Sequence, residues 1–454
     1  MRIADLENLR VAIWGLGREG HAAHTALRQR LPELRLTLFC NDAEAHFRAV
    51  ENPLDCYVTR APNAADLSAF DIVIKSPGIS AYRPELLDAQ RNGTRFTSAT
   101  ALWFAENPDA RVIAVTGTKG KSTTSALIAH LLRGLGRRTA LAGNIGLPLL
   151  ELLDPPLAPD WWVVELSSFQ TRQASDVRLA VITNIEEEHL DWHGSRERYV
   201  GDKLALADSA RLLLVNDLQA ELLQLTSQHA QRLRYGHAPG WHVAEGAIRR
   251  GDRAVLELAR LPLPGLHNAM NACAALAAVE AVGEDALAAA DALATFRALP
   301  HRLQTLGKRD AVGWIDDSIA TTPQATIEAL RSLDGRKVSV IVGGFDRGLD
   351  WQPFAEYVHA HPPHAVIVNG ANGRRIAARL HAQQGEYRLH SVANLAEAVA
   401  IARDETPAGG VVLLSPGAPS FDQFHDYAER GRSFAELAGF DAEAIGQIDG
   451  LGIA

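Results

Sequence analysis

Short apolar runs rich in β-branched residues alternate along the chain with longer amphipathic stretches. An apolar run followed by a helical pattern is typical of a βαβ unit, in which parallel strands are buried between helices. The pattern predicts strands at residues 10–14, 35–39, 71–75, 112–115, 162–166, 180–184, 212–215, 338–342, 365–368 and 411–414. It also predicts an alanine-rich helix from His267 to about Val282. We therefore predict an α/β fold built on parallel sheets.

The alternation of strands and helices runs in three blocks. The first block ends near residue 98, after a turn that begins at Lys75. The second block ends near Pro300, and the third continues to the last residue. A chain of 454 residues exceeds the length of a typical domain several times. We therefore predict three domains, at residues 1–98, 99–300 and 301–454.

Composition and charge narrow the class of protein. The hydrophobic share of 47% and the charged share of 22% are typical of globular proteins. The net charge of −9 argues against a protein that mainly binds nucleic acid. No apolar run reaches the roughly 18 residues of a membrane span, and the first residues lack a signal-peptide core, so we expect a cytoplasmic protein. Cys40, Cys56 and Cys273 form no metal-binding pair, and we expect all three to be buried in a reducing compartment.

The stretch RVIAVTGTKGKSTT places a glycine-rich loop between a predicted strand and a predicted helix. The usual phosphate-loop spacing requires a glycine where this chain has Val115, but that position falls inside the strand. Gly117 and Gly120 allow backbone N–H groups to converge on phosphate oxygens. Lys121 can reach the β- and γ-phosphates, and Ser122 can bind magnesium. We predict a nucleotide-binding loop that is followed by a helix from Ser122.

A second glycine pattern, GLGREG, begins at Gly15 and follows the first predicted strand. This G-x-G-x-x-G spacing can bind the phosphates of NAD, although alone it is a weak signal. The strand that should supply a ribose-binding acid ends at Asp42, which is late for that role. We interpret the first block as a Rossmann-like module for a phosphate-bearing ligand, with an NAD-dependent oxidoreductase as the alternative.

Two polar stretches follow predicted strands of the second block. Glu165 in ELSSFQ and His189 in EEEHLD lie just past the carboxyl ends of their strands, where parallel sheets bind ligands. They could meet the phosphate loop and hold a metal ion, although a lone acid or histidine is more often a structural group. Lys203, considered by itself, is typical of a solvated lysine on a helix.

Nine motifs along nearly the whole chain resemble those of the Mur ligases, most closely the branch that adds glutamate to UDP-N-acetylmuramoyl-L-alanine. They are TGTKGKST at 116–123, GNIG at 143–146, ELSSFQ at 165–170, EEEHLDWH at 186–193, GLHNAMNACAA at 265–275, LPHR at 299–302, DDSIAT at 316–321, GGFDRG at 343–348 and SPGAPSFDQF at 415–424. The resemblance implies Rossmann-like domains at both ends, for the UDP-sugar and for glutamate, and a central ATPase-like domain. It also implies an ATP-dependent ligase of peptidoglycan synthesis that works through an acyl phosphate.

The resemblance implies roles for the residues that match the family. The catalytic residues would be Lys121, Asn144, His189 and Lys203. ATP would be bound by Gly117, Thr118, Lys119, Gly120, Lys121, Ser122, Thr123, Asn268, Asn271, Arg302 and Asp317. Two magnesium ions would be held by Ser122, Glu165, His189 and a carbamylated Lys203, in contrast to the solvated lysine that the local sequence indicates. Glutamate would be bound by Thr321, Arg347, Ser420 and Tyr427, and the UDP-sugar by Gly15, Leu16, Gly17, Asn41, Ser76 and Gly78.

One departure from the family bears on the amino acid. The D-glutamate ligases usually have Ser-Lys-Ala-Thr where this chain has Ile319 in place of the lysine. Lys119 and the EEEH sequence are similar to a branch that joins L-glutamate, whose product an epimerase then inverts. We therefore expect L-glutamate as the substrate and such an epimerase as the next enzyme, with D-glutamate as the alternative.

Three other functions remain as alternatives. Folylpolyglutamate synthase shares the central loop but lacks the N-terminal block, so residues 1–98 oppose it. An NAD-dependent oxidoreductase would leave the phosphate loop and every later motif unexplained. A non-catalytic nucleotide-binding partner conflicts with the intact set of Lys121, Glu165, His189 and Lys203. We expect a monomer that binds small-molecule substrates and no nucleic acid.

Overall fold

The computed structural model of the chain describes all residues except 42–43, 45–51, 187–189 and 449. The described residues fall into two compact units. The first unit contains Met1–Leu261, His267–Phe296 and Gly450–Ala454, and the second contains Pro262–Leu266 and Arg297–Asp449.

The first sheet of the first unit has the strand order β3-β2-β1-β4-β5, with parallel pairing throughout. Its strands are β1 (Val11–Trp14), β2 (Leu36–Phe39), β3 (Asp55–Val58), β4 (Ile72–Lys75) and β5 (Arg95–Thr97). The helices beside them are η1 (Ile3–Leu6), α1 (Arg18–Arg30), α3 (Ala64–Ser68), α4 (Pro84–Arg91) and α5 (Ala99–Glu106). Ile13 packs with Leu27 of α1 on one face, and Ala12 packs with Leu86 of α4 on the other. This alternation buries both faces of the sheet, as βαβ units require.

The second sheet of the first unit has the order β11-β10-β9-β6-β8-β7-β21, parallel except for the antiparallel β21. Its strands are β6 (Val112–Thr116), β7 (Thr139–Gly143), β8 (Trp161–Glu165), β9 (Val177–Ile182), β10 (Ala210–Asn216), β11 (Arg232–Tyr235) and β21 (Gly452–Ile453). Its helices are α6 (Lys121–Gly134), η2 (Leu149–Leu152), η3 (Thr171–Gln173), α7 (Leu190–His193), α8 (Arg196–Asp208), α9 (Ala220–Leu225), η4 (Leu258–Arg260), α10 (Leu266–Ala281), α11 (Ala286–Ala289) and η5 (Ala290–Thr295). An antiparallel sheet of β12 (Trp241–Ala244), β13 (Ala247–Arg250) and β14 (Arg253–Glu257) accompanies it.

The two large sheets of the first unit share one apolar core. Trp103 of α5 packs against Trp162 of β8 with ring centroids 4.7 Å apart. Leu149 of η2 and Leu27 of α1 belong to the same cluster of buried residues. This shared core explains why residues on both sides of the predicted boundary at 98/99 form one compact unit.

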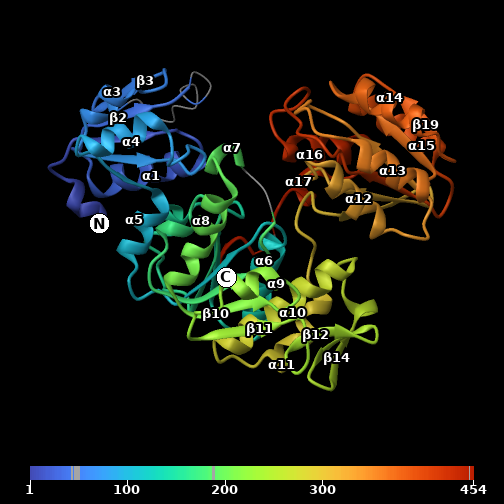
Figure 1. The fold of residues 1–454 in the computed structure, drawn as a ribbon, viewed down its shortest axis with the longest axis horizontal. Coiled ribbons are helices and arrows are strands. Elements are labelled where there is room, and N and C mark those ends of the chain that lie inside the picture. The colour runs from blue at the N-terminus through green and yellow to red at the C-terminus, as the bar shows by residue number, and fades with distance from the viewer. Residues whose placement is uncertain (42–43, 45–51, 187–189, 449) are drawn as a thin grey trace. The chain divides into compact units, whose positions relative to one another are not determined.

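Helices cover both faces of the sheet in the second unit (Figure 1). The strand order is β15-β16-β20-β17-β18-β19, from β15 (Gln304–Arg309), β16 (Val312–Asp316), β17 (Val338–Val342), β18 (Ala365–Val368), β19 (Arg388–Ser391) and β20 (Val411–Leu414). The helices are α12 (Pro323–Arg331), α13 (Gln352–Ala360), α14 (Gly373–Gln383), α15 (Leu395–Glu405), α16 (Tyr427–Ala438) and α17 (Ala442–Ile445). Val340 packs with Phe354 of α13 on one face, and its neighbour Ile341 packs with Phe434 of α16 on the other. The predicted α/β fold with parallel sheets is therefore confirmed.

Most elements predicted from the sequence are present, with small differences at their ends. Each predicted strand matches an observed strand, and the predicted alanine-rich helix is α10. The helix after the phosphate loop begins at Lys121, one residue earlier than predicted. The predicted burial of Cys56 is wrong, because β3 lies at an edge of its sheet and leaves this residue exposed. The last five residues, which we assigned to the third domain, belong to the first unit because Gly452 of β21 pairs with Leu141 of β7.

Candidate active site

The phosphate loop connects β6 to α6 in a conformation that favours glycine at two positions. Gly117 has φ +150° and Gly120 has φ +80°. A Cβ at Gly117 would lie 1.9 Å from Thr183 Oγ1, and a Cβ at Gly120 would lie 2.5 Å from Asn271 Oδ1. Because α6 starts at Lys121, the positive end of its helix dipole faces the loop. This arrangement is suited to an anionic ligand such as a nucleotide phosphate.

The loop is held by residues that follow β9. Asn184 Oδ1 accepts hydrogen bonds from the backbone N–H of Thr118 and of Lys119, at 3.0 and 2.8 Å. Thr183 Oγ1 donates to the carbonyl of Lys119 at 2.7 Å. Lys121 Nζ donates to the carbonyl of Thr118 at 2.9 Å. Asn184 was not predicted as a site residue, although its place at a strand end in the second block could have indicated it.

A buried carboxylate lies beside the loop. Glu165 ends β8 and pairs in register with Val115 of β6, so both lie at the same edge of the sheet. Asn144 Nδ2 donates to Glu165 Oε1 at 2.8 Å. Glu165 Oε2 is buried and has no hydrogen-bond partner among the residues that the structure describes.

An unpartnered buried carboxylate oxygen is costly unless a cation binds it. Magnesium prefers oxygen ligands and often takes only one or two carboxylates from a protein, so Glu165 fits this ion. Ser122, the second residue of α6, is buried in the first turn that follows the loop. The predicted ligand His189 lies outside the described residues. Within the described ranges, no three His, Cys, Asp or Glu side chains are grouped as a metal site.

Lys203 is buried on α8, with 2% of its surface exposed. Its Nζ lies 4.8 Å from the centre of the Tyr199 ring, and the Tyr199 hydroxyl is 2.6 Å from Thr118 Oγ1 in the phosphate loop. The solvated position that the local sequence indicated is therefore wrong, because tertiary contacts bury this face of α8. Lys203 is thus buried beside Tyr199, which contacts the phosphate loop. This position is compatible with a carbamylated lysine that holds magnesium, the role that the family resemblance implies.

Asp202, next to Lys203, joins several segments of the first unit. Its carboxylate accepts hydrogen bonds from the Tyr82 hydroxyl at 2.8 and 2.9 Å and lies 2.7 Å from His193 Nδ1. Arg172 Nε also donates to it. His193 Nε2 is in turn 3.0 Å from Ser168 Oγ. Tyr82 lies between β4 and β5 of the first sheet, so this buried carboxylate links the first sheet to the phosphate-loop region.

A pocket of about 500 Å³ lies in the first unit between its two large sheets. The loops that follow β1 and β4 form one side, and the loops that follow β7 and β8 form the other. Its lining residues are Gly15, Gly17, Arg18, Glu19, Glu44, Ser76, Pro77, Gly78, Ile79, Gly143, Asn144, Gly146, Pro148, Ser167, Phe169 and Gln170. The pocket thus brings Gly15, Gly17, Ser76 and Gly78 together with Asn144.

Leu16 and Asn41, two further residues predicted for the UDP-sugar, do not line this pocket. Leu16 is buried in the core of the first sheet. Asn41 Oδ1 instead accepts a hydrogen bond from the backbone N–H of Glu44 at 2.8 Å. The contacts of these two residues with a UDP-sugar stay predictions.

The remaining predicted nucleotide residues lie on α10 and in the second unit. Asn268 and Asn271 lie one turn apart on α10, and Asn271 Oδ1 is 3.4 Å from Thr124 Oγ1 of α6. In the second unit, Leu303 N and Ser415 Oγ donate to the Asp317 carboxylate at 3.1 and 2.8 Å. Burial raises the pKa of Asp317 to about 7. Arg302 lies next to Leu303, so the second unit brings Arg302 and Asp317 close together.

The predicted glutamate residues gather at the carboxyl ends of β16, β20 and β17, which are neighbours in the second unit. Thr321 follows β16 and Ser420 follows β20. Arg347 follows β17, and Tyr427 is the first residue of α16. Phe345 N donates to the carbonyl of Pro419 at 2.8 Å, which joins two of these loops.

Arg430 is a buried cation at this edge that was not predicted from the sequence. Its guanidinium donates to the carbonyls of Ser318 and Ala418 at 2.8 and 3.0 Å. Its Nη1 is buried without a hydrogen-bond partner within the described part of the chain. Burial lowers the pKa of Arg430 to about 10. The motif SPGAPSFDQF ends before this residue, so that motif did not indicate it.

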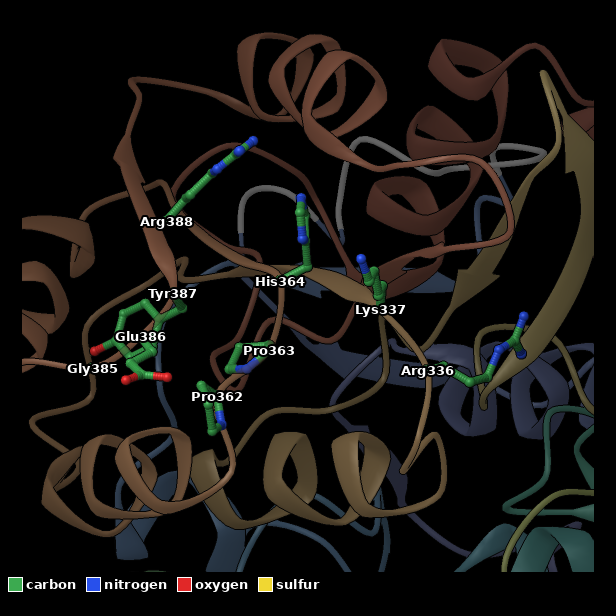
Figure 2. Close-up of a pocket in the computed structure, with 9 residues that line it drawn as sticks. All are labelled: Arg336, Lys337, Pro362, Pro363, His364, Gly385, Glu386, Tyr387 and Arg388. Carbon is green, nitrogen blue, oxygen red and sulfur yellow. The ribbon is translucent and has the colours of Figure 1, made fainter.

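A depression of about 520 Å³ lies at the opposite edge of the same sheet, where β17, β18 and β19 begin. Figure 2 shows Lys337, His364 and Arg388 extending to one side of this edge. Arg388 pairs with the Glu405 carboxylate, and His364 Nε2 lies 2.9 Å from the Glu405 carbonyl. The depression holds none of the residues predicted for substrates or metal.

Comparisons with known proteins agree with the motifs. Models of the Mur ligase middle domain and of the Mur ligase glutamate ligase domain match residues 115–279 and 301–417. The UDP-N-acetylmuramoyl-L-alanine–L-glutamate ligase of Xanthomonas euvesicatoria pv. vesicatoria is 50% identical over 467 residues, which cover 100% of both chains. The enzyme of the same name from Xylella fastidiosa is 50% identical over 469 residues, again covering 100% of both chains.

A solved structure supports the fold. The crystal structure of UDP-N-acetylmuramate-alanine ligase from Thermotoga maritima matches with a TM-score of 0.63 and 20% identity, over 95% of this chain and 99% of that one. None of the helices in the described ranges is long and apolar enough to span a membrane. On the domain models and the relatives at 50% identity, the chain belongs to the Mur ligase family.

Proposed function

We propose that this protein is an ATP-dependent ligase that joins glutamate to UDP-N-acetylmuramoyl-L-alanine in peptidoglycan synthesis. One observation carries the substrate assignment. The pocket of about 500 Å³ has Gly15 and Ser76 on one side and Asn144 on the other, and Asn144 is bonded to Glu165 beside the phosphate loop. A UDP-sugar bound through its diphosphate at Gly15 would therefore extend toward the nucleotide loop. The names of the relatives at 50% identity support the same substrate.

The chemistry follows from the weak electrophilicity of a carboxylate. An oxygen of the L-alanyl carboxylate attacks the γ-phosphorus of ATP, ADP leaves, and an acyl phosphate forms. Lys121 and the amides of the first turn of α6 would hold the phosphates, and Asn144 would orient the acyl group. Glu165 would hold magnesium, which when bound would offset the charge on the transferred phosphoryl group. The glutamate amine then attacks the acyl carbon, loses a proton and displaces phosphate.

Lys203 is proposed to act as a carbamate. The ammonium group would first lose a proton to solvent, and the neutral amine would then bond to the carbon of CO₂ and lose a second proton. The resulting carbamate is a carboxylate that could serve a second magnesium ion. The support is its burial beside Tyr199, whose hydroxyl contacts Thr118 of the phosphate loop. His189 would complete this set by the family resemblance alone.

We propose L-glutamate as the incoming amino acid. Glutamate brings two carboxylates, and each needs a cation or several hydrogen-bond donors in a partly dehydrated site. Arg347 would bind one of them, while Thr321, Ser420 and Tyr427 would serve the other. Ile319 places an apolar side chain where D-glutamate ligases have a lysine, so the two carboxylates should be arranged differently around the α-carbon. The relatives named for L-glutamate support this choice.

The remaining assignments follow from this function. We place the enzyme in the cytoplasm, as a monomer, with a glutamate epimerase acting on its product. A folylpolyglutamate synthase would not need the sheet of β1 to β5 and its pocket. The function of an NAD-dependent oxidoreductase would not require the phosphate loop that Asn184 holds. D-glutamate remains the alternative for the amino acid.

Replacing the loop lysine tests the assignment of the phosphate loop. Lys121→Ala should leave binding of UDP-N-acetylmuramoyl-L-alanine nearly intact, because the lysine does not line that pocket. Ligation, followed by phosphate release from ATP, should fall by roughly several powers of ten. Lys308→Ala, at an exposed lysine of β15, is the matched control and should be as active as the wild type. Near-normal turnover of Lys121→Ala would refute the assignment.

A further inference from the structure

Glu19 lies in the first turn of α1 and lines the pocket that we assign to the UDP-sugar. Gln170 Nε2 donates to Glu19 Oε1 at the long distance of 3.4 Å. Glu19 Oε2 is buried and has no hydrogen-bond partner within the described part of the chain. The protein therefore leaves one oxygen of this carboxyl group without a hydrogen bond, on a residue that lines a pocket.

A structural role as a helix cap does not account for this side chain. Acidic residues in a first turn often stabilise a helix through its dipole or by accepting from its free N–H groups. The start of α1 at Gly17 has no side-chain capping bond. Glu19 thus occupies the end of the helix without bonding to its backbone.

An ionised Glu19 carboxylate would be unfavourable if a diphosphate binds in the pocket that Glu19 lines. The loop from Gly15 to Gly17 and the start of α1 form the place where Rossmann-like folds bind phosphates. Two like charges in a partly dehydrated pocket repel each other strongly. A neutral carboxyl group would instead donate a hydrogen bond to a phosphoryl oxygen, and that bond would be charge-assisted.

The surroundings favour the neutral form. Burial raises the pKa of Glu19 to about 7, and the charge of Glu151 on η2 also raises it. Arg18, the preceding residue of α1, lowers it. The long hydrogen bond from Gln170 also lowers the pKa of Glu19, and Glu44 is a second carboxyl group in the pocket lining. Near neutral pH the free enzyme would hold a proton on Glu19 in a substantial fraction of molecules.

We propose that Glu19 binds the diphosphate of the nucleotide sugar as a neutral carboxylic acid and takes up a proton from solvent when the ligand binds. This inference rests on the proposed UDP-sugar site. No covalent bond changes: the proton moves from water or buffer to Glu19, which donates it in a hydrogen bond to a phosphoryl oxygen. A diester diphosphate stays fully ionised between pH 6 and 9, so the ligand itself does not supply the proton.

The sign of the pH dependence follows from linkage. A ligand that favours the protonated form raises the pKa of the carboxyl group further, so the complex holds more protons than the free enzyme above pH 7. Binding should be tightest below pH 7. Above it, affinity should fall by up to about tenfold for each pH unit, until the pH passes the pKa of the complex.

Calorimetric titration of the full-length protein with UDP-N-acetylmuramoyl-L-alanine, without ATP, tests the inference. Titrations between pH 6 and 9, in buffers of different ionisation enthalpy, count the protons taken up. We expect up to one proton at pH 8 in the wild type. Glu19→Gln, which keeps a neutral donor, should bind with no uptake and with a nearly constant Kd. Glu151→Gln, at a neighbouring carboxylate outside the pocket lining, should retain the uptake.

Three results would overturn the inference. Tight binding without proton uptake in the wild type would show that Glu19 stays ionised or distant from the ligand. This measurement does not depend on the folding of any variant. Uptake that persists in Glu19→Gln would assign the proton to another group. Failure of the wild type to bind the nucleotide sugar at any pH would refute the proposed substrate itself, and this inference with it.

Discussion

Asn144 Nδ2 donates a 2.8 Å hydrogen bond to Glu165 Oε1, while Glu165 Oε2 is buried with no partner in the described residues. The amide thus fixes one oxygen of the carboxylate and leaves the other available for a cation. A half-satisfied buried carboxylate destabilises the metal-free protein and is stabilised when magnesium binds. This relationship leads to the first prediction.

Glu165→Gln should melt at a higher temperature than the wild type in EDTA, because the buried charge is gone. It should lose the rise in melting temperature that magnesium gives the wild type. Its kcat should fall by roughly two powers of ten or more. Thermal melts with and without magnesium, together with phosphate release, measure these effects. Glu436→Gln, at an exposed residue of α16, should behave as the wild type, and an unchanged response to magnesium in Glu165→Gln would exclude Glu165 as a ligand.

Gly120→Ala tests the close packing of the phosphate loop. Gly120 has φ +80° and an added Cβ would lie 2.5 Å from Asn271 Oδ1. Gly136, with φ +75°, is a matched control, since nothing in the described residues lies within 4 Å of its Cβ. Gly136→Ala should cost about 1–2 kcal/mol of unfolding free energy, through backbone strain alone. Gly120→Ala should cost more by roughly 1–3 kcal/mol and should weaken ATP binding.

Denaturant unfolding of both glycine variants, and of Gly120→Ala combined with Asn271→Ala, measures the contact. The double variant should recover part of the additional unfolding free energy that Gly120→Ala loses, because the clashing amide of Asn271 is removed. If Gly120→Ala and Gly136→Ala lower the unfolding free energy by the same amount, the packing of the loop against α10 is contradicted.

A double-mutant cycle tests the link between Tyr82 and Asp202. The Tyr82 hydroxyl donates to the buried Asp202 carboxylate, so Tyr82→Phe should lower the unfolding free energy by about 1–3 kcal/mol. In an Asp202→Asn background the same substitution should cost less, which gives a coupling energy of at least about 0.5 kcal/mol. Tyr387→Phe in the second unit should show no coupling with Asp202→Asn. Strict additivity of Tyr82→Phe and Asp202→Asn would show that the hydrogen bond does not link the sheets.

The sequence predicts best those strands that are buried on both faces of a sheet. All residues of β17 are buried, and its unbroken apolar run is visible without any structure. In contrast, β16 was missed because its sequence VGWID mixes a glycine and an aspartate with apolar residues. The exposed Cys56 was missed because an edge position depends on the order of strands, which the local pattern does not contain.

In the candidate site, too, local features could be predicted from the sequence, whereas contacts between distant segments could not. The order of strand, loop and helix around Lys121 could be derived from local spacing. The burial of Lys203 could not, because its helix has no strong apolar face and the covering residues come from elsewhere in the fold. Nor could the meeting of His193 with Asp202, or of Asn184 with the loop, because these contacts depend on how distant segments pack.

The central claim is that this chain forms an amide between UDP-N-acetylmuramoyl-L-alanine and glutamate, with a preference for the L enantiomer. The most direct test is phosphate release from ATP by the full-length protein, with the nucleotide sugar and each glutamate enantiomer in turn, and mass analysis of the product. We predict release with stoichiometric amide formation and a kcat/KM for L-glutamate at least about tenfold above that for D-glutamate, which requires roughly 1.4 kcal/mol of differential transition-state binding. A clear preference for D-glutamate would contradict the L assignment, and no amide with either enantiomer would contradict the ligase itself.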